Sequence, residues 1–210
     1  MKFLNLLLPL VLLPVLSNAQ SAPATDTAKK AQRKVIVYIE QEPEFPGGIN
    51  SFYQYINSNL HYPDVAKLLG INGKVIVDFW VDKTGCIIDV SAPNSLGAGC
   101  EYEAKKVVAS SPLWHPGIQM SHPVKVHFKV PVNFDQVKNR VKMQELKDSD
   151  YGFVFSIKDK LYTIDEAQEQ LGKSFRQDKI GSAEVFYNQD NDEKFAAPGK
   201  KEVYLVKIKS

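Results

Sequence analysis

The segment over residues 73–92 constrains the fold most, because its pattern predicts a β-hairpin. Apolar residues alternate with polar or charged ones over residues 73–82 and again over residues 86–92, and this period of two is typical of strands that bury one face. Asp82-Lys83-Thr84-Gly85 lies between the two runs and predicts a turn, since glycine readily adopts the positive φ that closes such a loop. The hairpin is either plain scaffold or part of a sheet that offers an edge to a partner strand.

The composition is that of a folded globular protein and argues against two classes of partner. The chain has 210 residues, of which 44% are hydrophobic and 24% are charged, which suits one or two domains with a real core. The formal net charge is only +2, and lysines and acids are interspersed along the chain. We therefore expect neither nucleic acid nor a strongly charged membrane surface as a partner.

The first 19 residues predict a cleaved export signal. A lysine at position 2 precedes an apolar run from Leu4 to Leu16, and Ser17-Asn18-Ala19 then supplies small residues for a signal peptidase. The run is shorter than the roughly 20 residues of a spanning helix, and two prolines interrupt it. We expect an exported protein with no integral membrane span after cleavage. The alternative is that residues 4–16 remain as a membrane anchor.

Export would place Cys86 and Cys100 in an oxidising compartment, so a disulfide between them has to be considered. Cys86 begins a predicted strand and Cys100 follows its end, which separates them by roughly 20 Å unless the loop folds back. A disulfide requires Cα atoms within about 7 Å of each other. Both cysteines lie on apolar stripes, so we expect two buried free thiols, with a disulfide as the alternative.

A first domain is predicted over residues 35–136, with five elements besides the hairpin. Residues 20–34 have no periodicity and predict a flexible lead. A short apolar run predicts a strand, helical spacing of apolar residues predicts two helices, and strict alternation predicts one long strand. In chain order these elements are residues 35–39, 49–60, 100–110 and 124–134. Pro131 lies in the long strand and donates no hydrogen bond, so that strand is expected at a sheet edge. A second, short helix is expected after residue 62, with Pro63 as its first residue.

The C-terminal part predicts a second, smaller unit. Residues 137–150 are charged with few large apolar residues and predict a linker. Residues 151–210 predict a small β-α-β-β module, in which Thr163 and Glu166 fit a capping box at the start of the helix. The expected elements are a strand over 153–157, the helix up to residue 171, and strands over 180–187 and 202–208.

Catalytic chemistry is not predicted from this sequence. His122 and His127 are five residues apart, so in one strand they would face opposite sides and could not share a metal. The sequence has no glycine-rich phosphate loop, no nucleophile elbow and no cysteine set with metal-binding spacing. We expect no enzyme activity, no metal and no cofactor. Trp114 is expected to close the core from one side, and Tyr55 is an exposed candidate for a partner surface.

A series of short motifs over residues 35–135 resembles the C-terminal domain of TonB-type proteins from Bacteroidetes-like bacteria. The positions that carry the resemblance are Phe45, Pro46, Gly47, Gly48, Tyr62, Pro63, Ala66, Gly70, Gly73, Asp82, Gly85, Cys100, Glu103, Ala104, Val107, Val108, Trp114, Pro116, Gly117, Pro123, Val124 and Pro131. The resemblance implies an α+β fold in which helices pack on a small antiparallel sheet. The last sixty residues resemble a module that trails such domains and the start of a receptor plug.

The resemblance also implies a function. TonB domains grip a short peptide of an outer-membrane transporter by β-augmentation, in which the peptide pairs with a free strand edge. By this resemblance the partner-binding residues are Val124, Lys125, Val126, His127, Phe128, Lys129 and Val130. We expect a non-enzymatic periplasmic module that binds a periplasmic or outer-membrane protein in TonB-dependent transport, with a TonB-dependent receptor peptide as one candidate partner and a second copy as another. A membrane-anchored energy transducer and an envelope structural or assembly protein remain as alternatives.

Overall fold

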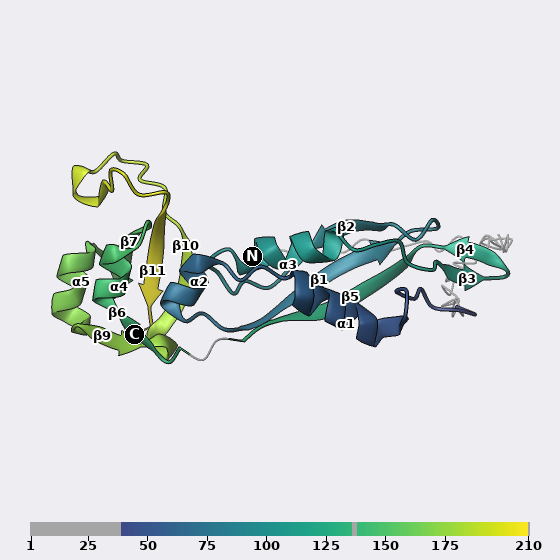
Figure 1. Ribbon diagram of the computed structural model, residues 1–210. Helices are drawn as coiled ribbons and strands as arrows, with labels where there is room; N and C mark the ends of the chain where they lie inside the picture. The colour runs from purple at the N-terminus through teal and green to yellow at the C-terminus, as the bar shows by residue number, and fades with distance from the viewer. Residues whose placement is uncertain (1–38, 136–137, 210) are drawn as a thin grey trace, which may run out of the picture. The chain divides into compact units, whose positions relative to one another are not determined.

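A computed structural model describes residues 39–135 and 138–209, which form helices packed on sheets that are antiparallel except for one parallel strand pair in the C-terminal part (Figure 1). The predicted export signal and flexible lead lie outside these residues, as does the predicted strand over 35–39 except for Ile39. No helix in the described ranges is both long enough and apolar enough to cross a membrane. The predicted α+β class is confirmed by this arrangement.

The first sheet has three antiparallel strands in the order β2-β1-β5, with β1 in the centre. β1 spans Gly73–Val81, β2 spans Ile87–Ser91 and β5 spans Val126–Phe134. The predicted hairpin is confirmed, because β1 and β2 pair across the turn at Asp82. The Asp82 carboxylate accepts hydrogen bonds from the backbone N–H of Thr84 and Cys86 at 2.8 and 2.9 Å. This side chain therefore fixes the turn from inside.

Three helices precede or follow these strands: α1 (Gly48–Asn59), α2 (Asp64–Leu69) and α3 (Cys100–Ala109). α1 and α3 cover one face of the sheet (Figure 1). Their predicted positions are confirmed, but Pro63 is the N-cap of α2 and not its first residue, since its ψ of 139° is extended. Gly70 ends α2 in the left-handed conformation with φ of 66°, which a glycine adopts without strain.

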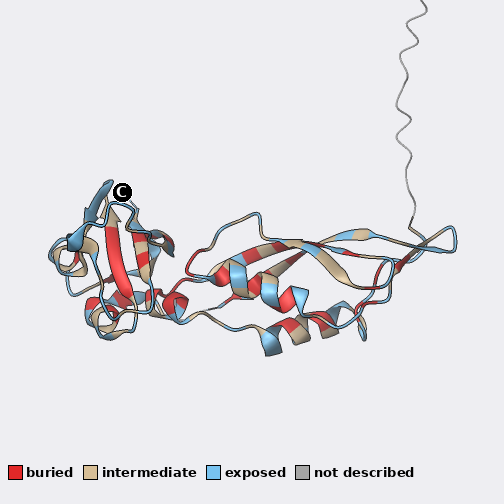
Figure 2. Ribbon diagram, turned by 90° about the horizontal axis from the view of Figure 1, so that it is seen from above, coloured by how far each residue is buried: buried red, intermediate tan, exposed pale blue. Residues whose placement is uncertain are grey.

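The core of this part is formed by the alternate residues of β1 and by aromatic rings from the helix side. Val75, Val77 and Phe79 are fully buried, whereas Trp80 is 36% exposed; Figure 2 shows the buried residues in red. The Trp114 ring packs edge-on against Phe52 at a centroid distance of 4.8 Å and is 3% exposed. The prediction that Trp114 closes the core is therefore confirmed.

The long strand predicted over residues 124–134 is wrong at its start. β3 (Gly117–Gln119) and β4 (His122–Val124) form a separate hairpin, so Val124 belongs to β4 and Lys125 lies between β4 and β5. The turn of this hairpin places Met120 and Ser121 at φ of 46° and 60°. The backbone N–H groups of Met120 and Ser121 donate to the carboxylate of Glu40 at 3.0 and 3.3 Å. A distant residue thus stabilises a turn that lacks glycine.

The C-terminal part contains a four-stranded sheet in the order β10-β11-β7-β8 and a two-stranded sheet of β6 and β9. The bounds of its elements are β6 Arg140–Lys142, α4 Met143–Asp148, β7 Gly152–Ile157, β8 Lys160–Tyr162, α5 Ile164–Leu171, β9 Ser174–Arg176, η1 Gln177–Lys179, β10 Ile180–Val185, η2 Glu193–Phe195 and β11 Val203–Ile208. The predicted strand-helix-strand-strand order is present as β7, α5, β10 and β11, with β8 and β9 in addition. The predicted capping box of Thr163 and Glu166 is confirmed.

The segment over residues 137–150, which we predicted as a linker, contains secondary structure. β6 and α4 occupy this segment, and Val141, Met143 and Leu146 are fully buried. Three well-spaced apolar residues are enough to dock a charged segment onto a core, because its polar residues remain on the solvent side. The boundaries predicted for the two domains remain predictions.

Both cysteines are free thiols, so the disulfide alternative is wrong. Cys100 is fully buried, and burial raises the pKa of its thiol to about 12. Cys86 is only partly buried, which differs from the expectation that both would be enclosed. A neutral, enclosed thiol such as Cys100 is a poor nucleophile.

Candidate functional site

The edge of β5 is the feature that could bind another chain. β5 pairs with β1 in an unbroken register of nine residue pairs, from Gly73 opposite Phe134 to Val81 opposite Val126. On its other side, β5 pairs with no strand of the described residues. An edge strand carries a row of backbone N–H and C=O groups that are free to pair.

The backbone groups that face this open edge can be identified from the neighbouring hydrogen bonds. The Asn94 side chain accepts from the Ile76 N–H at 2.6 Å and donates to the Lys74 carbonyl at 2.8 Å, on the β2 side of β1. The even-numbered residues of β1 therefore point their backbone N–H and C=O groups toward β2. The odd-numbered residues point theirs toward β5. In the observed register, this leaves residues 127, 129, 131 and 133 of β5 with their backbone groups directed outward.

Pro131 agrees with this assignment. It lies opposite Ile76, at a position where a backbone N–H would point away from β1 and toward the open edge. A proline there removes no hydrogen bond from the sheet, which is the condition under which strands tolerate proline. The open edge therefore offers the N–H groups of His127, Lys129 and Asn133 as donors, with a gap in donors at Pro131.

The opposite border of the sheet is less suited to pairing. The register between β1 and β2 shifts between Asp78 and Trp80, and Asp89 in β2 has a φ of 55°. A bulge of this kind twists and interrupts a strand edge, which discourages further pairing. β5 is thus the straighter and longer of the two borders.

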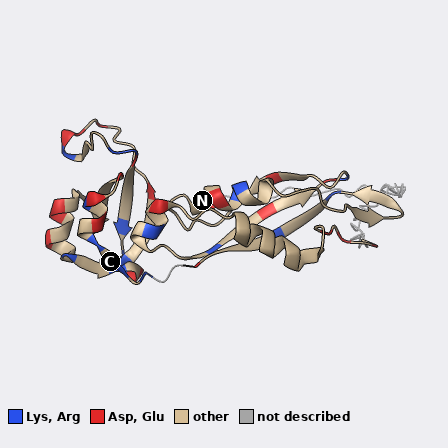
Figure 3. Ribbon diagram, viewed as in Figure 1, with Lys and Arg blue, Asp and Glu red and all other residues tan. Residues whose placement is uncertain are grey.

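The sheet face opposite the helices carries a polar and aromatic cluster at the β5 border. The His127 ring lies 4.9 Å from the Trp80 ring between centroids, and the Lys125 ammonium lies 4.7 Å from the same indole ring. Lys125 also pairs with Asp89 at 2.7 Å. Oppositely charged residues are interspersed over the elements (Figure 3), so this face has no large field of one sign.

Lys129 links the edge strand to the central strand. Its ammonium lies 3.2 Å from Oδ2 of Asp78, whose side chain is 18% exposed. Oδ1 of Asp78 is buried and has no hydrogen-bond partner in the described ranges. The charge of Lys129 therefore compensates a carboxylate that is only partly solvated.

The structure places most of the predicted partner-binding residues together. Val126, His127, Phe128, Lys129 and Val130 all lie in β5, and they alternate between the helix-covered face and the open face. Val124 and Lys125 lie outside the strand, as described above. Tyr55, which we expected to be exposed, is partly buried and its hydroxyl donates to the Ser110 carbonyl at 2.7 Å. Tyr55 therefore has a packing role.

Four of the glycines predicted as motif residues share one conformational property, a positive φ. Gly47, Gly48, Gly73 and Gly85 all have positive φ, at 84°, 83°, 143° and 88°. Gly85 is also sterically restricted, since a Cβ atom there would lie 1.9 Å from the Trp114 carbonyl oxygen. Of the other motif residues, Gly117 begins β3, whereas Phe45, Pro46, Tyr62, Pro63 and Pro116 lie in the segments that join the elements.

Sequence reasoning missed a pocket beside the start of β5. Its volume is about 440 Å³, and its lining residues are Glu42, Pro43, Glu44, Phe45, Ile49, Trp114 and Phe128. These residues come from a loop, the start of α1, a turn and β5, so only tertiary folding brings them together. The alternation of acids at positions 40, 42 and 44 was the only sequence signal near it.

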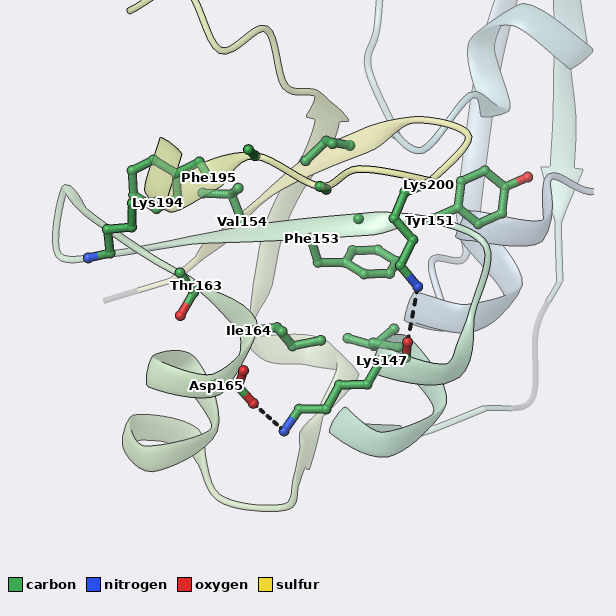
Figure 4. Close-up of a pocket in the computed structure, with 15 residues that line it drawn as sticks. Lys147, Tyr151, Phe153, Val154, Thr163, Ile164, Asp165, Lys194, Phe195 and Lys200 are labelled. Carbon is green, nitrogen blue, oxygen red and sulfur yellow. Dashed lines mark hydrogen bonds and ion pairs between the residues drawn. The ribbon is translucent and has the colours of Figure 1, made fainter. Parts of the chain in front are cut away.

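A second pocket, of about 350 Å³, lies in the C-terminal part between β7, the start of α5 and the loop around Phe195 (Figure 4). Its lysines already have partners: Lys147 pairs with Asp165 at 2.7 Å and Lys194 pairs with Glu166 at 3.0 Å. Lys200 donates to the carbonyls of Lys147 and Ser149, the former at 3.1 Å. These contacts fix the loop to the helices and leave this pocket mainly apolar.

No cluster of three or more His, Cys, Asp or Glu residues within 39–135 and 138–209 has the geometry to hold a metal ion. The raised pKa of a tyrosine side chain in this part is also explained by packing. Burial raises the pKa of Tyr62 to about 12, and its hydroxyl donates to the Ile71 carbonyl.

Comparison with known proteins agrees with this description for part of the chain. Residues 58–135 match the family model described as "Gram-negative bacterial TonB protein C-terminal", so the predicted resemblance is confirmed over these residues. This range contains β1, β2, α3 and β5. The family is associated with transport and not with catalysis. The Bacteroidetes type and the plug-like module remain predictions.

Two solved structures are also similar, both NMR solution structures of the Helicobacter pylori TonB C-terminal domain. One is 22% identical, covers 43% of this chain and 95% of that chain, and has a TM-score of 0.34. The other is 23% identical, covers 45% and 89%, and has a TM-score of 0.33. No curated protein matches the chain.

Proposed function

We propose that this protein is a non-enzymatic periplasmic module that binds an extended segment of a partner protein along the open edge of β5, in TonB-dependent transport across the outer membrane. The observation that carries the proposal is the one-sided pairing of β5 over nine residue pairs. Three outward N–H groups and four outward carbonyls are available there to a partner strand. The match of residues 58–135 to the TonB C-terminal family supports the same role.

The proposed partner is a periplasmic or outer-membrane protein, with the peptide of a TonB-dependent receptor as the first candidate. Lys129 and Pro131 oppose non-specific strand pairing along this edge, because charged residues and proline on an edge strand discourage aggregation. A partner strand must therefore accommodate the missing donor at Pro131. This requirement favours a short partner segment that needs no hydrogen-bond donor opposite Pro131 over a long strand that pairs without interruption.

Two alternatives lead to different observations. A membrane-anchored energy transducer requires that residues 4–16 are retained, and mass spectrometry of the protein isolated from the envelope decides this. An envelope structural or assembly protein requires stable oligomers in sizing experiments. The proposal expects a mature N-terminus near Gln20 and a monomer in the absence of a partner.

The proposed pairing is tested by removing one outward N–H group. Peptides that bind the protein are first selected from a display library of short random sequences. In His127→Pro the outward donor is lost, but no bond to β1 is lost, as Pro131 illustrates. We expect the affinity for selected peptides to fall about tenfold or more, since a lost hydrogen bond and a steric clash together exceed 1.4 kcal/mol.

His127→Thr is the matched control, because it removes the same imidazole and keeps the N–H. Its affinity should stay within about twofold of the original protein, and both variants should keep the original thermal stability within a few degrees. If His127→Pro binds the selected peptides as tightly as His127→Thr does, the edge of β5 is not the binding surface.

A further inference from the structure

The pocket beside β5 is lined by Phe128 of the edge strand and by no residue of β1 or β2. The Phe128 ring stacks on Phe79 at a centroid distance of 5.6 Å. Phe79 on the central strand is fully buried, whereas Phe128 is only partly buried. The accessible side of Phe128 is therefore the side away from β1, where the pocket lies and where a partner strand would be added.

The burial of β5 changes along its length on the helix-covered face. Val130 is 3% exposed, and Val132 and Phe134 are fully buried, but Val126 and Phe128 are partly exposed. A strand added to β5 would direct alternate side chains toward this face. The side chain opposite Phe128 would thus reach the pocket, over Ile49, which is 48% exposed.

The rim of the pocket is acidic. Glu42 and Glu44 line it, and neither forms an ion pair with any residue of the described ranges. The floor is formed by apolar and aromatic groups, of which Phe45 and Trp114 are 6% and 3% exposed. An apolar floor with a negative rim is complementary to a bulky apolar side chain next to a cation.

We infer that the partner segment carries a bulky apolar residue with lysine or arginine two positions before or after it, on the same face of the strand, and that the pocket of Glu42, Glu44, Ile49 and Phe128 selects this sequence. The inference rests on the proposed strand pairing along β5. Backbone hydrogen bonds along the edge supply affinity without sequence preference, and the pocket supplies the preference.

Three synthetic peptides with a common backbone of alternating valine and threonine test this specificity on the full-length protein. The first has a phenylalanine with one lysine two positions before it and another two positions after it, the second has alanine in place of the phenylalanine, and the third has glutamates in place of the lysines. We expect the first to bind about tenfold more tightly than either of the others at low salt. High salt should reduce the difference between the first and third peptides, because exposed charges are screened.

Two variants of the protein assign the preference to the pocket. Ile49→Ala should reduce the preference for phenylalanine over alanine from about tenfold to about threefold. The double variant Glu42→Gln and Glu44→Gln should reduce the preference for lysine over glutamate to below about twofold. Both sets of substitutions are at exposed or half-exposed positions, so the thermal stability should change little.

The outcomes separate this inference from the proposed function. If all three peptides bind equally and His127→Pro still lowers their affinity about tenfold or more, strand pairing stands and the pocket specificity is overturned. If no peptide binds and His127→Pro has no effect, the proposed function fails as well. If the protein forms a dimer that the first peptide does not dissociate, a second copy fills the edge, and the inference of a basic-apolar partner segment is wrong.

Discussion

Substitution of Gly85 by alanine tests the packing that holds the β1–β2 turn against the core. Gly85 has a φ of 88°, and its carbonyl accepts a hydrogen bond from the Trp114 N–H at 2.9 Å. A Cβ atom would lie 1.9 Å from the Trp114 carbonyl oxygen. The backbone of one residue therefore has to move by more than about 1 Å before the contact becomes tolerable.

The free energy of unfolding that Gly85→Ala should lose is the sum of three contributions. A left-handed alanine costs about 1–2 kcal/mol, and loss of the hydrogen bond to Trp114 costs about 0.5–1.5 kcal/mol. Displacement of the buried indole adds about 1–2 kcal/mol of lost burial. Gly85→Ala should therefore reduce the free energy of unfolding by about 3–5 kcal/mol, which is a large part of the stability of a typical domain.

Gly199→Ala is the matched control. Gly199 has a φ of 80°, but no atom lies within 4 Å of a Cβ placed there. Gly199→Ala should therefore lose only the about 1–2 kcal/mol that an alanine costs in the left-handed conformation. The assay is urea unfolding followed by far-UV circular dichroism, because Gly199 lies in the C-terminal part and both tryptophans, Trp80 and Trp114, lie outside it. If the two variants lose the same stability to within about 1 kcal/mol, the close approach of Trp114 to Gly85 is not real.

Three further predictions concern single groups. The Asp82 pKa is lowered by its hydrogen bonds with Thr84, so its contribution to stability is present above the unfolded pKa of about 3.9 and is lost as the pH falls through the lower folded pKa. Asp82→Ala should therefore flatten the acid limb of the stability curve measured by urea titration, and an unchanged limb would contradict this. Cys100, with its pKa raised to about 12, should resist a thiol reagent at pH 8 in the folded protein and react in urea; rapid modification of the folded Cys86→Ser variant would show that it is not enclosed. Thr163→Ala removes the capping box of α5 and should cost about 1 kcal/mol, whereas Thr163→Ser should cost much less; equal losses in thermal unfolding would exclude the cap.

The elements that could be predicted from the sequence are those whose signals are local. The hairpin around Asp82 and Gly85 combines strand alternation with a turn that its own side chains stabilise. α5 likewise carries its start signal in Thr163 and Glu166. Pro131 predicted an edge strand because a proline excludes a central position, and β5 is at the sheet edge.

The features that the sequence could not predict depend on contacts between distant residues. The turn at Met120 and Ser121 has no glycine or asparagine, and its N–H groups are satisfied by Glu40, about eighty residues away in the chain. The buried residues of the segment 137–150 are too few to be distinguished from those of a linker. The pocket beside β5 is assembled from residues 42–49, Trp114 and Phe128, three stretches that are far apart in the sequence, so no local pattern marks it.

Amide hydrogen exchange of β5, measured residue by residue by NMR, tests the central claim most directly. In the protein alone, the N–H groups of Phe128 and Val130 should exchange slowly, because they are bonded to β1. Those of His127, Lys129 and Asn133 should exchange fast, and should become slow when a selected peptide is added to saturation. If the amides of His127, Lys129 and Asn133 are already protected without a partner, or remain fast with the peptide bound, the account of an open edge that recruits a strand is wrong.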